Sequence, residues 1–152
     1  MKEVIEFNNS NEDKAMPYFK QETLESSNAK KGIDDKKYLE ALSASFEGNK
    51  AILNAVFEEN KLDAICGITM GPACSIDVIY GDRWGGYSLT SPAATTGNPH
   101  ITVPCGLAYD LPVGLSFFGT AYKEGELIGL GYAYEQVSKK RLKPGFKDSF
   151  LE

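Results

Sequence analysis

The sequence is poor in the residues that most metal sites and cysteine-based active sites need. It has one histidine, one tryptophan and three cysteines, and no two cysteines follow a Cys-x-x-Cys spacing. One histidine and scattered carboxylates provide no recognisable set of metal ligands. We therefore expect no metal and no other cofactor. The three thiols are expected to be reduced and mostly buried, as in a cytosolic protein.

Long apolar runs and an excess of positive charge are also missing. No run approaches the ~20 apolar residues that cross a bilayer, and the N-terminal residues lack the apolar core of a secretory signal. The net charge is −5, with acidic and basic residues mixed, which does not indicate nucleic-acid binding. We expect a cytoplasmic protein that binds neither a membrane nor, directly, a nucleic acid.

The composition favours one ordinary globular domain of 152 residues, of which 42% are apolar. Residues 1–61 hold most of the charge and read as helical. Residues 62–122 are rich in glycine, proline and small residues, which is typical of strands and loops. Residues 123–152 return to a helical pattern and end in a basic tail. We expect a single domain over residues 1–152 with these three parts.

Start and stop signals predict three of the helices. The first covers residues 2–8 and ends in an Asn-Asn-Ser turn. The second begins near Pro17, which suits a first helical turn, and ends at Gly32. The last covers residues 124–141, with glutamates at its start and basic residues at its end, as the helix dipole favours.

The clearest helix covers residues 35–59, with Asp34 or Asp35 as its N-cap. Its apolar residues recur at intervals of three, four and seven, which places them on one face that we expect to pack in a core. These residues are Leu39, Leu42, Phe46, Leu53 and Val56. Gly48 inside the helix suggests that a neighbouring group packs closely there.

Three strands are predicted in the centre of the chain. They cover residues 62–69, 101–105 and 113–118, and Pro104 restricts the second to an edge, an end or a bulge. The apolar run of the first is typical of a strand covered on both faces. We expect residues 62–69 and 113–118 to pair in one sheet. Strands combined with flanking helices make the fold class α/β.

Candidate chemistry within the chain is weak. Cys105 follows His100 by five residues, but burial in an apolar strand raises a thiol pKa and lowers its reactivity, so a structural role is favoured. Ser88 follows the residues Gly85-Gly86-Tyr87 but has no neighbouring serine, so it is not favoured as a nucleophile. The aromatic residues between Tyr80 and Tyr87 could form a ligand platform, although packing under a loop is the favoured interpretation.

A larger signal comes from the segment SPAATTGNPHITVPCGLAYDLPVGLSFFG at residues 91–119, which continues into GTAYKEGELIGLGYAYEQ. This segment closely resembles the C-terminal portion of the amidase signature family. Three shorter motifs agree in order with the helical region that precedes it. They are Phe7-Asn8-Asn9, Met16 to Glu22, and Gly32-Ile33-Asp34.

The resemblance implies a mixed β-sheet covered by α-helices. It also implies that the parent enzyme hydrolyses a carboxamide C–N bond with a Ser–cis-Ser–Lys triad. The nucleophile loop and the lysine would lie upstream of everything matched, so the isolated chain should be inactive. By the same resemblance, Met70, Gly71, Asp82 and Trp84 would line the substrate pocket of the parent.

Two function classes stay open. In the first, the chain is a C-terminal amidase fragment whose partner is the rest of the parent chain and whose substrate is a small amide. In the second, it is a non-catalytic binding module built on the same scaffold. In both cases uncovered sheet edges and helix faces should promote self-association of the isolated chain.

Overall fold

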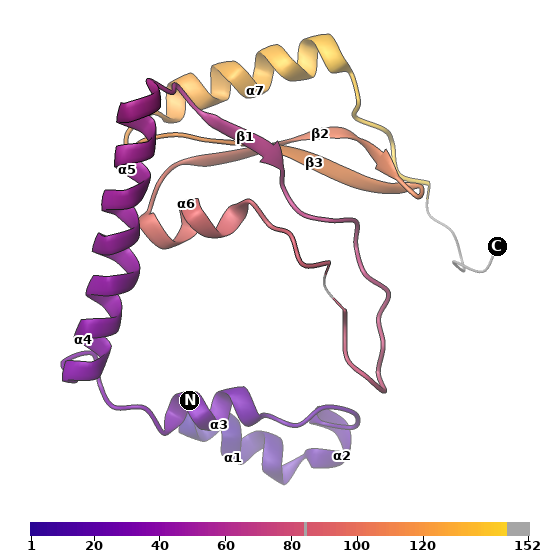
Figure 1. Ribbon diagram of the computed structural model, residues 1–152. Helices are drawn as coiled ribbons and strands as arrows, with labels where there is room; N and C mark the ends of the chain where they lie inside the picture. The colour runs from indigo at the N-terminus through magenta and orange to yellow at the C-terminus, as the bar shows by residue number, and fades with distance from the viewer. Residues whose placement is uncertain (84, 146–152) are drawn as a thin grey trace. The chain divides into compact units, whose positions relative to one another are not determined.

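The computed structural model describes residues 1–83 and 85–145 (Figure 1). These residues form two compact units. The helical unit consists of residues 1–44 and 74–83. The sheet unit contains residues 45–73 and, of the part of the chain after residue 83, residues 85–145. The division of one domain into three segments stays a prediction.

The helical unit holds four helices, and a buried glutamine ties the first of them to the third. They are α1 (Lys2–Ser10), α2 (Glu12–Ala15), α3 (Glu22–Asn28) and α4 (Lys36–Leu42). The Gln21 amide nitrogen donates to the Ile5 carbonyl oxygen at 3.2 Å and to Asn9 Oδ1 at 2.7 Å. Asn8 Nδ2 donates to Gln21 Oε1 at 3.0 Å. The asparagines predicted to end the first helix are thus part of it, and α1 runs on to Ser10.

The helix predicted from Pro17 to Gly32 is wrong at both ends, since only α3 within it is helical. Pro17 lies in a bend between α2 and α3, and Gly32 lies beyond the end of α3. A residue that precedes proline is disfavoured in the helical region, and Met16 has φ −135° and ψ 48°. The proline therefore ends one helix instead of beginning the next.

The long helix predicted at residues 35–59 is three consecutive helical segments, α4, η1 (Ser43–Gly48) and α5 (Asn49–Asn60), where η1 is a π-helix. Asp35 caps its start as predicted, since its carboxylate accepts from Lys37 N at 3.1 Å.

The core expectation for its apolar stripe is only partly right. Leu53 packs against the core, whereas Leu39 and Leu42 are about half exposed. The buried residue of these three segments is Phe57, which lies outside the predicted stripe. Gly48 has no close neighbour, so the packing expected there is wrong. Periodicity identifies an apolar face but not the element that covers it.

The sheet unit is built on three antiparallel strands in the order β1-β3-β2. They are β1 (Ile65–Ile68), β2 (His100–Ala108) and β3 (Leu111–Phe118). Ile65 pairs with Phe118, so the predicted pairing of the first and last strands is confirmed. Every strand pairing among residues 1–83 and 85–145 is antiparallel, and the α/β class is confirmed.

The β2–β3 hairpin has a two-residue loop. Tyr109 and Asp110 both have positive φ, 53° and 61°, which is the conformation of a type I′ turn. Pro104 lies on β2, an outer strand of this sheet, and the pairing register shifts between Pro104 and Gly106. Proline cannot donate to a strand ladder, so this edge and bulge position confirms the prediction.

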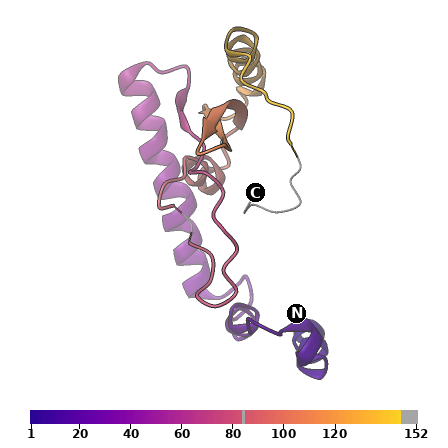
Figure 2. The same cartoon turned by 90° about the vertical axis from the view of Figure 1, so that its right-hand side faces the viewer.

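Helix α7 (Glu124–Ser138) covers one face of the sheet by packing on β2 and β3 (Figures 1 and 2). Phe117 meets Tyr134 edge to face with ring centroids 6.2 Å apart, and a Cβ on Gly131 would lie 3.2 Å from Ile101. The helix ends at Ser138, three residues before the predicted end. Lys139, with φ 48°, has left the helical conformation.

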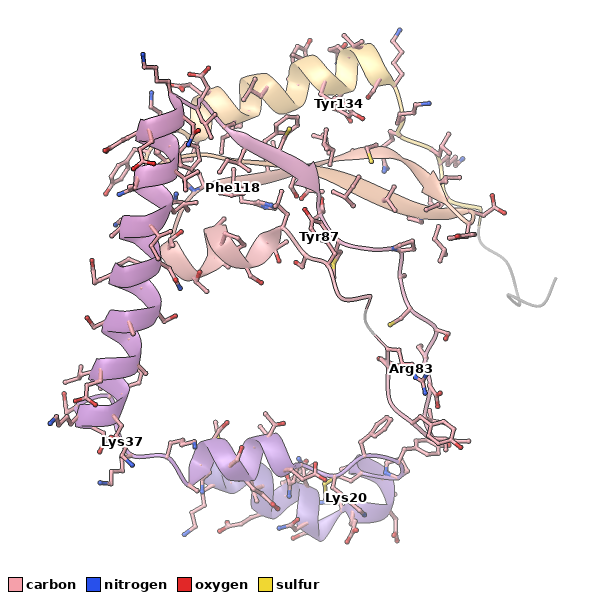
Figure 3. The ribbon with its side chains drawn as sticks, viewed as in Figure 1. Lys20, Lys37, Arg83, Tyr87, Phe118 and Tyr134 are labelled. Carbon is pink, nitrogen blue, oxygen red and sulfur yellow. The ribbon has the colours of Figure 1, made fainter. Side chains whose placement is uncertain are left out.

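Helices α5 and α6 (Thr90–Thr96) cover the other face at one end. The rings of Phe57 and Phe118 meet edge to face at 6.1 Å, and Ala93 of α6 completes this small core. Figure 3 shows Phe118 and Tyr134 on opposite sides of the sheet. The sheet is thus covered on both faces where β3 ends.

No helix among residues 1–83 and 85–145 is long and apolar enough to cross a membrane.

Candidate functional site at the end of strand β1

The end of β1 lies between strand β3 and the segment that leads into α6. Thr69 N donates to the Gly114 carbonyl oxygen at 2.8 Å, and Leu89 N donates to the Thr69 carbonyl oxygen at 2.9 Å. Met70 forms an isolated antiparallel bridge with Ser88. Two of the predicted pocket residues, Met70 and Gly71, therefore follow a strand end that is fixed on both sides.

Three hydroxyl side chains meet on the sheet face beside this strand end. Ser116 Oγ donates to Thr69 Oγ1 at 2.7 Å, and Thr102 Oγ1 lies 3.1 Å from Ser116 Oγ. Thr69 Oγ1 donates to Thr102 Oγ1 at 3.4 Å. We call these three side chains the hydroxyl triangle. Ser116 is fully buried, whereas Thr102 is exposed, so the triangle reaches from the core to the surface.

The triangle depends on a glycine in the central strand. A Cβ on Gly114 would lie 2.5 Å from Thr102 Cγ2 and 2.8 Å from Thr69 Oγ1, closer than packed atoms approach. Only a residue without a side chain lets the two threonines lie over β3 from its two neighbouring strands. Threonine is itself favoured in strands because it is β-branched.

More hydroxyl groups line the path from β1 into α6. A Cβ on Gly67 would lie 3.2 Å from the Tyr87 hydroxyl, so the tyrosine passes directly over β1 (Figure 3). Ser88 Oγ lies 2.7 Å from Thr90 Oγ1 and accepts from Thr90 N at 3.3 Å. Ser88 is thus used in a local turn before the helix, a common role for serine.

The other two predicted pocket residues belong to different parts of the chain. Asp82 belongs to the helical unit, where its carboxylate accepts from Asp77 N at 3.2 Å and closes a tight turn. In the same turn Asp77 Oδ1 accepts from Ile79 N and Tyr80 N, each at 2.9 Å, and these two bonds lower the pKa of Asp77. Trp84 lies outside the described residues.

The histidine and the cysteines show no catalytic arrangement. His100 Nε2 is buried and has no hydrogen-bond partner in the described part of the chain. Its ring lies 6.5 Å from that of Phe118, and burial lowers the pKa of His100. No hydrogen bond joins His100 to Cys105 within residues 1–83 and 85–145.

The expected burial of the cysteines is wrong. Cys66 is exposed, and Cys74 and Cys105 are only partly buried. Cys66 pairs with Phe117 and so faces the side of α7, but this helix packs on β2 and β3 and leaves β1 open.

The site offers neutral hydrogen-bonding groups rather than a nucleophile and its base. The described part of the chain has no group of three or more histidine, cysteine or carboxylate side chains that could hold a metal. Ser116 is hydrogen-bonded to two threonines, and no lysine donates to a serine hydroxyl among the described residues. The arrangement can therefore bind and orient a polar group.

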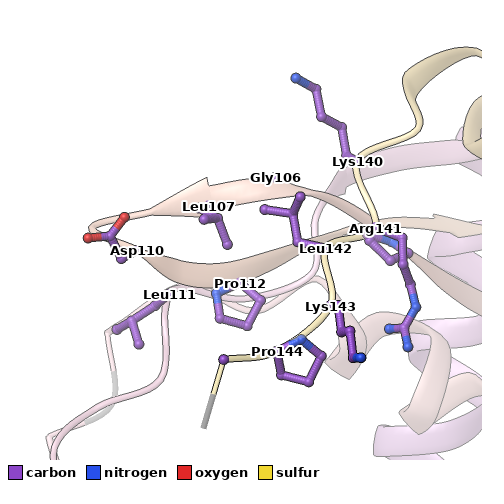
Figure 4. Close-up of a pocket in the computed structure, with 12 residues that line it drawn as sticks. Gly106, Leu107, Asp110, Leu111, Pro112, Lys140, Arg141, Leu142, Lys143 and Pro144 are labelled. Carbon is purple, nitrogen blue, oxygen red and sulfur yellow. The ribbon is translucent and has the colours of Figure 1, made fainter. Parts of the chain in front are cut away.

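A second concave feature lies at the other end of the hairpin (Figure 4). It has a volume of about 410 Å³ between the β2–β3 hairpin and residues 140–145, with Leu107, Pro112 and Leu142 among its lining. Arg141 and Lys143 point to the same side of this tail in Figure 4, whereas Lys140 points away. The cavity shares no residue with the hydroxyl triangle.

Sequence reasoning missed the hydroxyl triangle. One signal was present, because Ser116 interrupts the apolar run Val113 to Phe118 at an inward position. Its partners come from two other strands, and which residues lie opposite it depends on the pairing register. The bulge after Pro104 shifts that register along β2.

Comparisons with known proteins identify relatives of this chain, although no family model matches it. The chain is similar to the crystal structure of PAM12A, with 36% identity over 95% of the chain and a TM-score of 0.86. It is similar to the native peptide amidase from Stenotrophomonas maltophilia, with 35% identity over 96% of the chain and a TM-score of 0.84. It is also 46% identical, over 48 residues and 32% of its length, to a glutamyl-tRNA(Gln) amidotransferase subunit from Thermoanaerobacter pseudethanolicus.

These relatives are much longer than the chain. It spans 29% of the length of each of the two solved structures and 10% of the amidotransferase subunit. The match to the solved structures nevertheless extends over nearly all of this chain and over both sequence and fold. The chain is therefore homologous to a part of an amidase signature enzyme and has the fold of that part.

Proposed function

We propose that this chain acts as the C-terminal part of an amide-hydrolysing enzyme. The observation that carries the proposal is the match to PAM12A, because 36% identity and a TM-score of 0.86 extend over 95% of the chain. Conserved packing at that level supports a shared role for the part of the fold that matches. The substrate class we propose is a small carboxamide or a peptide amide, and we place the enzyme in the cytoplasm.

In this proposal the chemical step takes place on residues outside the chain. A serine would attack the amide carbonyl carbon, and a lysine would accept the serine proton through a bridging serine. The C–N bond would break as that proton passes to the leaving nitrogen, and water would then hydrolyse the acyl-serine ester. Backbone N–H groups would stabilise the oxyanion. The hydrogen bonds of Ser88 and Ser116 support this assignment, since both hydroxyls are occupied by threonines.

The role we propose for this chain is to form one wall of the substrate pocket. Met70 and Gly71 lie at the fixed end of β1, and Met70 is 37% exposed. Asp82 and Trp84 are proposed to line the same pocket in the complete enzyme. Substituting these four residues in an active complete enzyme and measuring turnover would test this assignment.

An apolar groove between α5 and α6 supports association with the rest of such an enzyme. It has a volume of about 390 Å³, and Ile52 and Val56 are 67% and 37% exposed along it. Exposed apolar surface of this kind commonly marks an interface. We propose that the rest of the parent chain covers this groove and that the isolated chain associates through it with other copies.

A chimera tests the proposed function. The segment of the Stenotrophomonas maltophilia peptide amidase that matches this chain is replaced by the chain, and hydrolysis of a peptide amide is measured. We expect turnover that a serine-reactive phosphonylating reagent abolishes. A control enzyme lacking the segment should be inactive. A folded chimera with no turnover would contradict the proposal.

The isolated chain should not hydrolyse amides. Loss of the nucleophile or its base costs on the order of 10⁶ in turnover in a serine hydrolase. Purified chain is incubated with primary and aryl amides and with the phosphonylating reagent, and we expect neither turnover nor an adduct. An adduct on one serine, with turnover lost when that serine is changed to alanine, would refute this assignment.

A further inference from the structure

We propose that the hydroxyl triangle of Thr69, Thr102 and Ser116 binds a neutral amide group of the substrate and discriminates against the carboxylate of the product. The inference rests on the proposed function and assigns a ligand to the site at the end of β1. It follows from the number of protons in the triangle, from its geometry and from the neutral partners that the three hydroxyls have among the described residues.

The proton count shows what the closed triangle can bind. Each hydroxyl has one proton and two acceptor lone pairs. Ser116 donates to Thr69 and Thr69 donates to Thr102, so the remaining contact must be a donation from Thr102 to Ser116. All three protons are then used and each oxygen keeps one lone pair. The closed triangle therefore accepts from a ligand N–H.

The geometry shows which bond a ligand can open. Hydroxyl–oxygen hydrogen bonds are usually 2.7–2.8 Å long. The contact from Thr69 to Thr102 measures 3.4 Å and is the longest of the three, and it lies at the exposed side of the triangle. Replacing this weak bond by a donation from Thr69 to a ligand carbonyl costs little. A group that offers both an N–H and a C=O, as an amide does, fits the triangle best.

The neutral hydrogen-bond partners of the triangle favour an amide over a carboxylate. Within residues 1–83 and 85–145, no lysine or arginine donates a hydrogen bond to any of the three hydroxyls. A carboxylate has no N–H to give to the free lone pairs, and its charge would lack a cationic partner. A substrate amide would bind here, and the acid formed by hydrolysis would leave.

The experiment compares an amide with its charged isostere on the full isolated chain. ¹⁵N-labelled protein is titrated with acetamide and, separately, with acetate, and backbone amide shifts are followed by NMR. We expect saturable shifts at Gly67, Gly114 and Thr102 with acetamide and none at the same acetate concentration. A lack of saturable shifts with acetamide, or an equal response to acetate, would overturn the inference.

Matched variants separate binding from folding. Thr102→Val removes an exposed hydroxyl at almost constant volume and should weaken acetamide binding about fivefold, the loss of one typical hydrogen bond. Thr102→Ser keeps the hydroxyl and should restore binding. Thr95→Val removes a hydroxyl of α6 whose hydrogen bonds, among the described residues, go to backbone carbonyl oxygens, and it should titrate like the unsubstituted chain. Unchanged binding in Thr102→Val would assign the triangle a structural role only.

The chimera distinguishes failure of this inference from failure of the proposed function. If the chimera hydrolyses peptide amides and Thr102→Val raises its KM with little change in kcat, both hold. If the chimera is active and Thr102→Val leaves KM and product inhibition unchanged, the inference fails while the proposed function stands.

Discussion

Gly114 gives the sharpest test of how the sheet is packed. A Cβ at this position would lie 2.5 Å from Thr102 Cγ2 and 2.8 Å from Thr69 Oγ1. Both neighbours are β-branched side chains, whose rotamers are restricted, and both are hydrogen-bonded to Ser116. Neither can move aside without breaking the hydroxyl triangle. Gly114→Ala should therefore destabilise the sheet unit.

The expected magnitude follows from two opposing effects. Forcing one extra methyl group into a packed site typically costs about 1–3 kcal/mol. Replacing glycine by alanine restricts the unfolded chain, which returns about 0.4–1 kcal/mol where the backbone conformation is allowed. The φ of Gly114 lies outside the left-handed region, so this second effect applies. We expect a net loss of about 1–2 kcal/mol in the free energy of unfolding.

The assay is urea unfolding followed by circular dichroism at a fixed protein concentration. Gly129→Ala in α7 is the matched control, because a Cβ there has no neighbour within 4 Å and alanine is favoured in a helix by up to about 1 kcal/mol. The double variant Gly114→Ala/Thr102→Ser removes the closest methyl group and should recover at least about 0.5 kcal/mol. A Gly114→Ala variant as stable as Gly129→Ala would refute the reasoning.

Two further predictions concern pH and association. Burial lowers the pKa of His100 below its value of about 6.5 in the unfolded chain. As the pH falls, the unfolded chain therefore binds a proton before the folded chain does. The contribution of neutral His100 to the free energy of unfolding should be complete above about pH 6.5 and be lost as the pH falls through the folded pKa. Thermal unfolding should show this loss below about pH 6.5 in the unsubstituted chain but not in His100→Phe, and equal pH dependence in the two proteins would contradict it. Self-association of the isolated chain should weaken in Ile52→Lys, which places a charge in the α5–α6 groove, whereas the control Lys50→Arg should not change it. If light scattering shows the same mass for the unsubstituted chain and both variants, the groove is not the self-association surface.

Much of the fold was predictable where local chemistry decides it. Pro104 predicted an edge or a bulge and occupies both, because proline cannot donate to a strand ladder. Asp35 predicted a helix start and caps it. The pairing of β1 with β3 followed from two apolar runs of strand length.

One error has a local cause, and the other lies where distant contacts decide the structure. Pro17 is compatible with a first helical turn, but its effect on the preceding Met16 ends α2 instead. Cys66 lies in an apolar run and was expected to be buried, yet the helix over that face leaves β1 open. No local pattern states which element covers a given face.

The candidate site was predictable only in part, for the same reason. Met70 and Gly71 could be placed after a strand, and the structure confirms that position. The hydroxyl triangle joins residues that are 14, 33 and 47 positions apart. Their meeting depends on the register of two strand pairs and on the absence of a side chain at Gly114, and a single sequence fixes neither.

The most direct test of the central claim is the rate of peptide-amide hydrolysis by the chimera, measured beside the same chimera carrying Gly114→Val. If this chain works as part of an amidase fold, the first protein turns over its substrate. The second should lose that activity, because valine cannot fit between Thr69 and Thr102. A well-folded first chimera without activity, or equal activity in both, would contradict the account.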